Sequence, residues 1–140
     1  MKLILSLLLI GAAGFADTSG NWQASGKWKH CDGSEEKVAV SIFVTQSESA
    51  LHFTKFDYKF PHGEFWYPEG DIEIRNGDLV SNGTKIGTIG PHDFQFVGLT
   101  TDSKTYVHYE LDKISEKLAH HVAYVLGHEC NRLDLILKTP

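Results

Sequence analysis

The chain has 140 residues, a length that fits one domain built on a single hydrophobic core. Acidic residues outnumber lysine and arginine by 18 to 13, which gives a formal net charge of -5. This acidic balance argues against nucleic acid and anionic membrane surfaces as partners.

Residues 1–16 have the three parts of a cleavable signal peptide. Lys2 supplies a positive charge, residues 3–10 are apolar apart from Ser6, and residues 14–16 form a small-x-small cleavage site. The apolar run is shorter than the roughly 20 residues that a membrane span needs, and no later segment is long and apolar enough. We therefore expect an exported protein, periplasmic or secreted, with one mature domain at 17–140 and no membrane span.

The only two cysteines, Cys31 and Cys130, lie near the two ends of this predicted domain. Exported proteins meet an oxidising environment, so we predict a disulfide between them. The alternative is a zinc site that adds His30 and His128 to the two thiols. Adjacent strand residues point to opposite faces, so His30 and Cys31 would not share an ion there. We therefore predict no metal and no cofactor.

The rest of the domain alternates short strands with turn residues at close and even spacing, as in sandwiches and barrels. The clearest strand is 37–45, in which β-branched Val38, Val40, Ile42 and Val44 occupy alternate positions. The other expected strands are 22–30, 50–60, 71–75, 78–81, 85–89, 93–99, 104–112, 117–126 and 132–138, and residues 65–67 lie between two turns.

Two further features of the sequence concern the hairpin turns and the structure of residues 117–126. Asn76-Gly77 and Asn82-Gly83 are strong hairpin signals, because both residue types accept a positive φ. The composition of 117–126 also suits a helix, but its alternation favours a strand. The sequence thus predicts an all-β protein with about eight to ten strands and little helix.

Three fragments resemble the lipocalin and wider calycin pattern. Residues 20–22, Gly-Asn-Trp, are similar to the G-x-W that opens the first strand of those barrels. Residues 101–106 are similar to the T-D-Y-x-x-Y motif between two late strands, with Ser103 in place of its first tyrosine. Arg132 is similar to the arginine that packs across the first-strand tryptophan. The resemblance implies a small antiparallel up-and-down β-barrel, calycin-like, with Arg132 over the Trp22 indole.

A second resemblance implies a different function. Residues 31–33, Cys-Asp-Gly, precede a valine-rich strand, and a second cysteine lies near the C-terminus. This arrangement is similar to small periplasmic barrels that inhibit lysozyme. It implies a protein partner, namely a secreted or cell-wall hydrolase.

The candidate ligand-binding residues are Trp66, Tyr67, His108 and His121. Residues 65–67 are three successive aromatics, which cannot all face inward, so at least one should be exposed. In the last hairpin, pairing Lys113 with Glu116 places His108 opposite His121. These two histidines, with Glu110, would form a patch able to bind a metal or respond to pH. We expect the patch to face solvent without a metal.

The opposite face of this hairpin is the expected core side. It carries Val107, Tyr109, Leu111, Leu118, His120, Val122 and Tyr124. Large side chains expected inside the barrel are Trp22, Trp28, Phe43, Phe56, Tyr109 and Tyr124, which would leave little room for a wide cavity.

The sequence contains no nucleophile elbow, zinc-protease helix or Gly-rich phosphate loop. We therefore expect a non-enzymatic, extracytoplasmic, lipocalin-like binding protein, with a small apolar ligand. The alternatives are an inhibitor of a lysozyme-type hydrolase and a structural protein of the cell envelope.

Overall fold

The structure is a computed structural model that describes residues 17–100 and 104–140, and it confirms the all-β fold. The predicted signal peptide at 1–16 and the motif residues 101–103 lie outside the described residues. The strands are β1 (Gly20–Lys29), β2 (Glu35–Gln46), β3 (Ala50–Phe60), β4 (Gly63–Trp66), β5 (Gly70–Arg75), β6 (Asp78–Ser81), β7 (Thr84–Ile89), β8 (Asp93–Leu99), β9 (Tyr106–Lys113), β10 (Leu118–Val125) and β11 (His128–Lys138). In the part of the chain that is described, no helix is long and apolar enough to cross a membrane.

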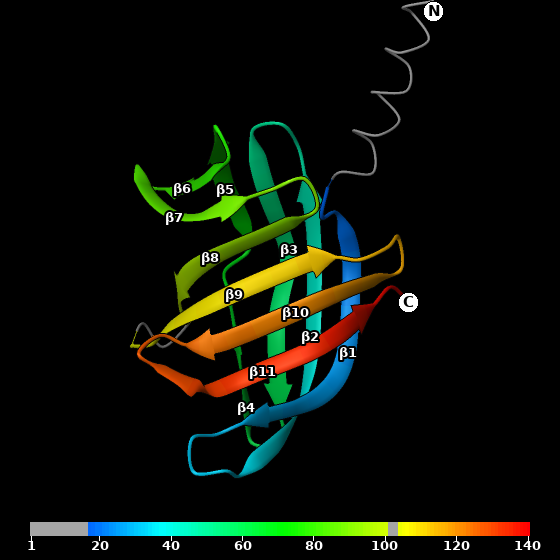
Figure 1. The fold of residues 1–140 in the computed structure, drawn as a ribbon, viewed down its shortest axis with the longest axis vertical. Helices are drawn as coiled ribbons and strands as arrows, with labels where there is room; N and C mark the ends of the chain where they lie inside the picture. The colour runs from blue at the N-terminus through cyan, green and yellow to red at the C-terminus, as the bar shows by residue number, and fades with distance from the viewer. Residues whose placement is uncertain (1–16, 101–103) are drawn as a thin grey trace, which may run out of the picture.

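Of the eleven strands in the described residues, ten form a closed antiparallel ring (Figure 1). If β4 is left aside, strands that follow one another in the chain pair with one another, and β1 closes the ring by pairing with β11. β4 lies outside the ring order. It pairs with one half of β3, while β5 pairs with the other half. The predicted up-and-down barrel is therefore confirmed, and the segment 117–126 is a strand, not a helix.

The two Asn-Gly pairs form the predicted hairpin turns. Asn76 and Asn82 have φ values of 52° and 51°, and the glycine after each also has a positive φ. Positive φ at both central residues matches the right-handed twist of the flanking strands. These turns connect β5 to β6 and β6 to β7.

The predicted register of the β9–β10 hairpin is wrong. Residues 114–117 connect the end of β9 to the start of β10, and Lys113 pairs with Ala119 instead of Glu116, so the connection is not a two-residue turn. The Ser115 hydroxyl accepts the backbone N–H groups of Lys117 and Leu118, which stabilises this longer turn. Each β9 residue therefore pairs with a β10 residue an odd number of positions away from the predicted one. Because side chains alternate along a strand, an odd shift turns every β10 side chain to the opposite face.

Aromatic side chains fill the barrel core. Phe56 contacts Phe53 and Tyr109, each with ring centroids 4.9 Å apart. The facing strand β10 turns Ala119, His121 and Ala123 inward, all fully buried, because large rings opposite leave room only for smaller groups. The other fully buried aromatic side chains are Trp22, Tyr58, Phe94 and Phe96.

Five sequence predictions about the core were wrong. Phe43 is 38% exposed on the outer wall, beside a register shift between β2 and β3. Four residues of β10 lie on its outer face because the longer turn reverses the two faces of the strand, namely Leu118, His120, Val122 and Tyr124.

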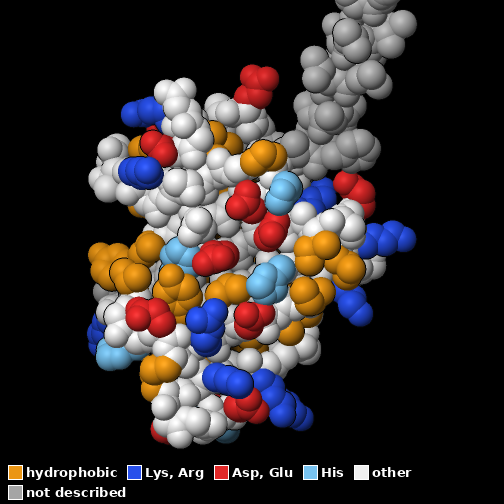
Figure 2. Space-filling model, in the orientation of Figure 1, with side chains coloured by type: hydrophobic (Ala, Val, Ile, Leu, Met, Phe, Trp, Pro, Cys, Tyr) orange, Lys and Arg blue, Asp and Glu red, His pale blue; other side chains and the backbone are white. Residues whose placement is uncertain are grey.

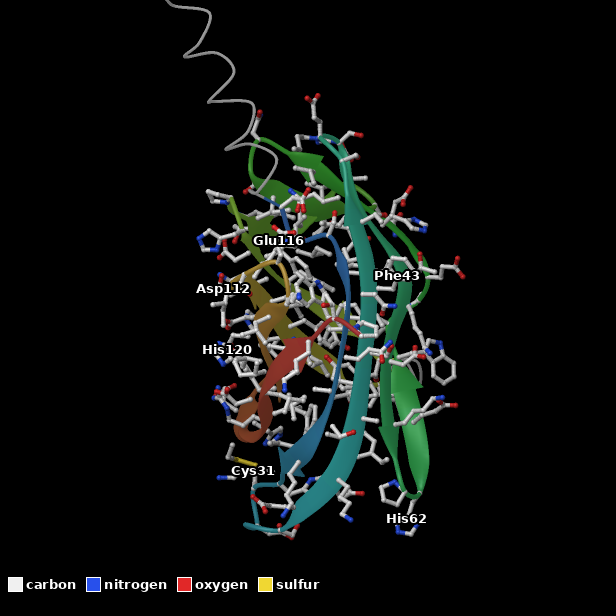
Figure 3. The ribbon with its side chains drawn as sticks, turned by 90° about the vertical axis from the view of Figure 1, so that its right-hand side faces the viewer. Cys31, Phe43, His62, Asp112, Glu116 and His120 are labelled. Carbon is white, nitrogen blue, oxygen red and sulfur yellow. A yellow bond between two sulfur atoms is a disulfide. The ribbon has the colours of Figure 1, made fainter. Side chains whose placement is uncertain are left out.

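The two ends of the barrel differ. Figure 3 shows Cys31 in the lower part of the molecule and Glu116 in the upper part. The predicted disulfide joins Cys31 to Cys130 and ties the β1–β2 loop to β11, and we call this the disulfide end. A disulfide fits an oxidising, extracytoplasmic environment. Because both thiols are bonded, the alternative zinc site is excluded.

At the opposite end, the cation over the Trp22 indole is Lys113, with its Nζ 6.0 Å from the ring centroid. Arg132 lies instead over the Tyr124 ring, at 5.6 Å, on the outer face. The contact that the lipocalin resemblance implied for Arg132 is therefore wrong. Arg132 pairs with Lys29 on β1, seven positions away from Trp22, and cannot reach it.

Candidate functional site

The structure does not bring the four predicted ligand-binding residues together. Trp66 is 43% exposed on the outside of β4, which confirms that one of the three successive aromatics faces solvent. Tyr67 turns inward, with its ring centroid 5.1 Å from that of Phe96. A Cβ at Gly98 would lie 2.6 Å from the Tyr67 ring, so this packing requires glycine there.

His108 and His121 lie on opposite sides of the barrel wall. His108 is on the outer face, where it stacks on Tyr124 at 4.6 Å and hydrogen-bonds Glu110 at 2.9 Å. His121 is fully buried inside. Their expected pairing is absent, because His108 pairs with Tyr124 and His121 with Leu111.

The interior position of His121 determines its charge. Its Nδ1 donates to the Glu110 carbonyl at 2.7 Å, so Nε2 is free to accept the Tyr58 hydroxyl at 2.5 Å. Burial lowers the pKa of His121 to about 4. The imidazole is therefore neutral at physiological pH, and its role in the core is to satisfy these two groups.

The outer wall carries a series of histidine–carboxylate pairs. The pairs, at 2.6 to 2.9 Å, are His52 with Asp71, His92 with Asp112, His108 with Glu110 and His120 with Asp134. Figure 2 shows histidine and acidic side chains side by side on the face of β8 to β11. Within residues 17–100 and 104–140, no group of three or more such side chains could hold a metal ion.

A pocket of about 380 Å³ lies at the disulfide end, at the mouth of the barrel. We call it the mouth pocket. It is lined by Trp28, His30, Glu36, Phe60, Glu64, Phe65, Thr100, Thr105, Val107, Val125 and Asn131. The filled core closes it from below, so it is a cup at one end of the barrel and not a channel through it.

Strand alternation places these side chains in the pocket. Trp28 continues the inward-facing positions of β1, and Glu36 lies directly opposite it on β2. Phe60 follows the buried Tyr58 by two residues on β3, and Phe65 pairs with Tyr58 across β3 and β4. The pocket therefore forms at the end of the barrel, where the inward-facing side chains of neighbouring strands are no longer covered by other core side chains.

Three aromatic rings make the apolar wall of the mouth pocket. Phe60 and Phe65 have their ring centroids 6.1 and 5.9 Å from that of Trp28, and 6.0 Å from each other. Phe65 also stacks on Tyr58 at 4.6 Å, which holds its ring in place. Trp28 is only 4% exposed, whereas Phe60 and Phe65 are half-buried and remain accessible.

Polar groups surround this aromatic wall. His30 Nε2 and Glu36 Oε1 are 2.7 Å apart, and the Trp28 indole N–H donates to the Asn131 side-chain oxygen. The disulfide immediately follows His30 and immediately precedes Asn131 in the chain, so it fixes both sides of the rim. The arrangement combines an apolar surface with a few fixed polar groups, which is the usual composition of a small-molecule site.

Sequence reasoning missed this pocket. The alternation of β1 and β2 already places Trp28 and Glu36 on inward faces, and a carboxylate in an inward position of a strand is an unusual signal. The remaining wall comes from β3, β4, β9, β10 and β11, whose convergence depends on ring closure.

Comparison of this chain with protein-family models, curated proteins and solved structures finds no match.

Proposed function

We propose that this chain is an extracytoplasmic, non-enzymatic binding protein that holds a small apolar ligand in the mouth pocket. The observation that carries the proposal is the accessible aromatic wall of Trp28, Phe60 and Phe65 at the end of a filled barrel. A volume of about 380 Å³ lies at the lower end of the range for ligand sites, roughly 300 to 1,000 Å³. The ligand is therefore small, on the scale of a compound with two or three aromatic rings.

The rigidity of the rim supports this proposal. The disulfide, the stacked Tyr58–Phe65 pair and the Trp28–Asn131 hydrogen bond hold three sides of the pocket before any ligand arrives. A preformed pocket loses little conformational entropy on binding, so even a small contact area gives useful affinity.

The test is a fluorescence titration with N-phenyl-1-naphthylamine, a neutral apolar probe. We expect saturable binding of one probe per chain. The substitution Phe65→Ala removes one aromatic wall and should weaken binding by about tenfold or more, since a lost phenylalanine contact is worth about 1.5 to 3 kcal/mol.

Phe43→Ala is the matched control, because Phe43 is a phenylalanine exposed on the outer wall. It should leave the affinity unchanged, and thermal unfolding should show that both variants are folded. Binding that is absent, unsaturable, or equally weakened by both substitutions contradicts the proposal.

A further inference from the structure

We infer that the ligand of the mouth pocket carries a protonated amine beside its apolar body, and that Glu36 is the counter-ion of this amine. The inference rests on the proposed function, because it names the chemical class of the ligand for the same pocket.

The position of Glu36 is the first reason. It lies directly opposite Trp28 across β1 and β2 and continues the series of buried, inward-facing residues Val38, Val40 and Ile42. Its side chain is still 38% exposed, so the carboxylate reaches the pocket without being sealed in the core. A carboxylate at an inward-facing position is costly unless it is paired, and beside an open pocket a ligand cation can add to its pairing with His30.

The hydrogen bonding of this carboxylate leaves room for a ligand. His30 Nε2 contacts Oε1 at 2.7 Å and fixes the orientation of the group. Among the described residues, Oε2 makes no hydrogen bond. An ammonium group has three donors, and a fixed carboxylate oxygen is a strong acceptor for one of them.

The remaining charges of the pocket also favour a cation. A second carboxylate, Glu64, lies at the rim, and none of the eleven described lining residues is lysine or arginine. The faces and edges of Trp28, Phe60 and Phe65 surround the same space, and aromatic faces attract organic cations. An anionic ligand would face two carboxylates and no lysine or arginine among these lining residues, which disfavours it.

The test compares three ligands of the same shape by isothermal titration calorimetry: 2-(1-naphthyl)ethylamine, 2-(1-naphthyl)ethanol and 1-naphthylacetate. At pH 7 the unmodified protein should bind the amine about tenfold more tightly than the alcohol, and the acid most weakly. Because this comparison needs no substitution, it does not depend on a variant folding.

Glu36→Gln should reduce the preference for the amine over the alcohol to nearly equal affinities. Glu48→Gln is the matched control, since it removes the same charge in the β2–β3 turn, away from the mouth pocket, and should keep the preference. An alcohol that binds as tightly as the amine, or a preference that survives Glu36→Gln, overturns this inference while leaving a neutral-ligand function intact. Failure of both the amine and the alcohol to bind, together with failure of the neutral probe above, overturns the proposed function and this inference with it.

Discussion

His121 is a titratable side chain in a core made otherwise of aromatic and aliphatic groups. Its ring packs against Tyr58 and Phe56 as another aromatic residue would, so the core stays filled at this position. Its Nε2 accepts the buried Tyr58 hydroxyl, and its Nδ1 donates to the Glu110 carbonyl. The same burial that makes this network favourable makes a positive charge there unfavourable.

We predict that His121 makes the protein less stable at acidic pH. Its pKa is about 4 in the folded state, against 6.5 for an unperturbed histidine. As pH falls below about 6.5, the unfolded state takes up the proton first, so the free energy of unfolding decreases. The loss should total about 3 kcal/mol and level off below about pH 4. Urea unfolding between pH 7 and pH 4 measures it.

His121→Gln is the comparison that isolates this effect. Glutamine can keep a hydrogen bond in the core but does not titrate, so the variant should be less stable at pH 7 and depend less on pH. The histidine–carboxylate pairs of the outer wall are present in both proteins and cancel in the difference. Equal pH dependence of the two proteins would show that His121 is not the group responsible.

At the scale of the elements, the sequence predicted the strands well where one strand's own residues decide the outcome. The valine and isoleucine alternation of β2 predicted its buried face, and the Asn-Gly pairs predicted two hairpins. Which side chains of β10 face inward depends instead on the length of the 114–117 turn. The sequence of this turn, Ile-Ser-Glu-Lys, contains no strong signal for its length. The two faces of β10 are similarly hydrophobic, so the pattern alone did not choose between them.

The disulfide links two elements, the β1–β2 loop and β11, that are 99 residues apart in the chain. We predict that Cys31→Ser with Cys130→Ser lowers the free energy of unfolding by up to about 4 to 5 kcal/mol, the value that loop-closure entropy suggests. Affinity for the neutral probe should also fall, because His30 and Asn131 would no longer be held together at the rim. Denaturant unfolding and the probe titration measure the two effects.

The direct control for the double serine variant is the unmodified protein treated with a reducing agent. Its denaturant unfolding and its affinity for the probe should match those of the variant. Unchanged unfolding after reduction, with the loss of the bond confirmed by mass, would contradict a stabilising role for the bridge.

At the scale of the whole molecule, ring closure creates the candidate site. Trp28 and Asn131 are joined by a hydrogen bond only because β1 pairs with β11. Phe65 enters the pocket only because β4 leaves the ring order and pairs with β3 alone. Local sequence patterns predicted a barrel, but they do not specify which inward-facing residues meet at each end. The pocket therefore became visible only in the assembled fold.

The three tryptophans report on three separate regions of the molecule. Trp28 lies in the mouth pocket, Trp22 is buried beneath Lys113 at the opposite end, and Trp66 is exposed on the outer wall. Each indole N–H gives its own signal in a ¹⁵N–¹H correlation spectrum, so the protein carries both a reporter and two controls.

The most direct measurement is a titration of the ¹⁵N-labelled protein with 2-(1-naphthyl)ethylamine, observed through these three indole signals. A ligand in the mouth pocket should shift the Trp28 signal saturably and leave the Trp22 and Trp66 signals in place. A Trp28 signal that does not move, or a saturable shift of Trp66 or Trp22 instead, would contradict the assignment of the mouth pocket as the binding site.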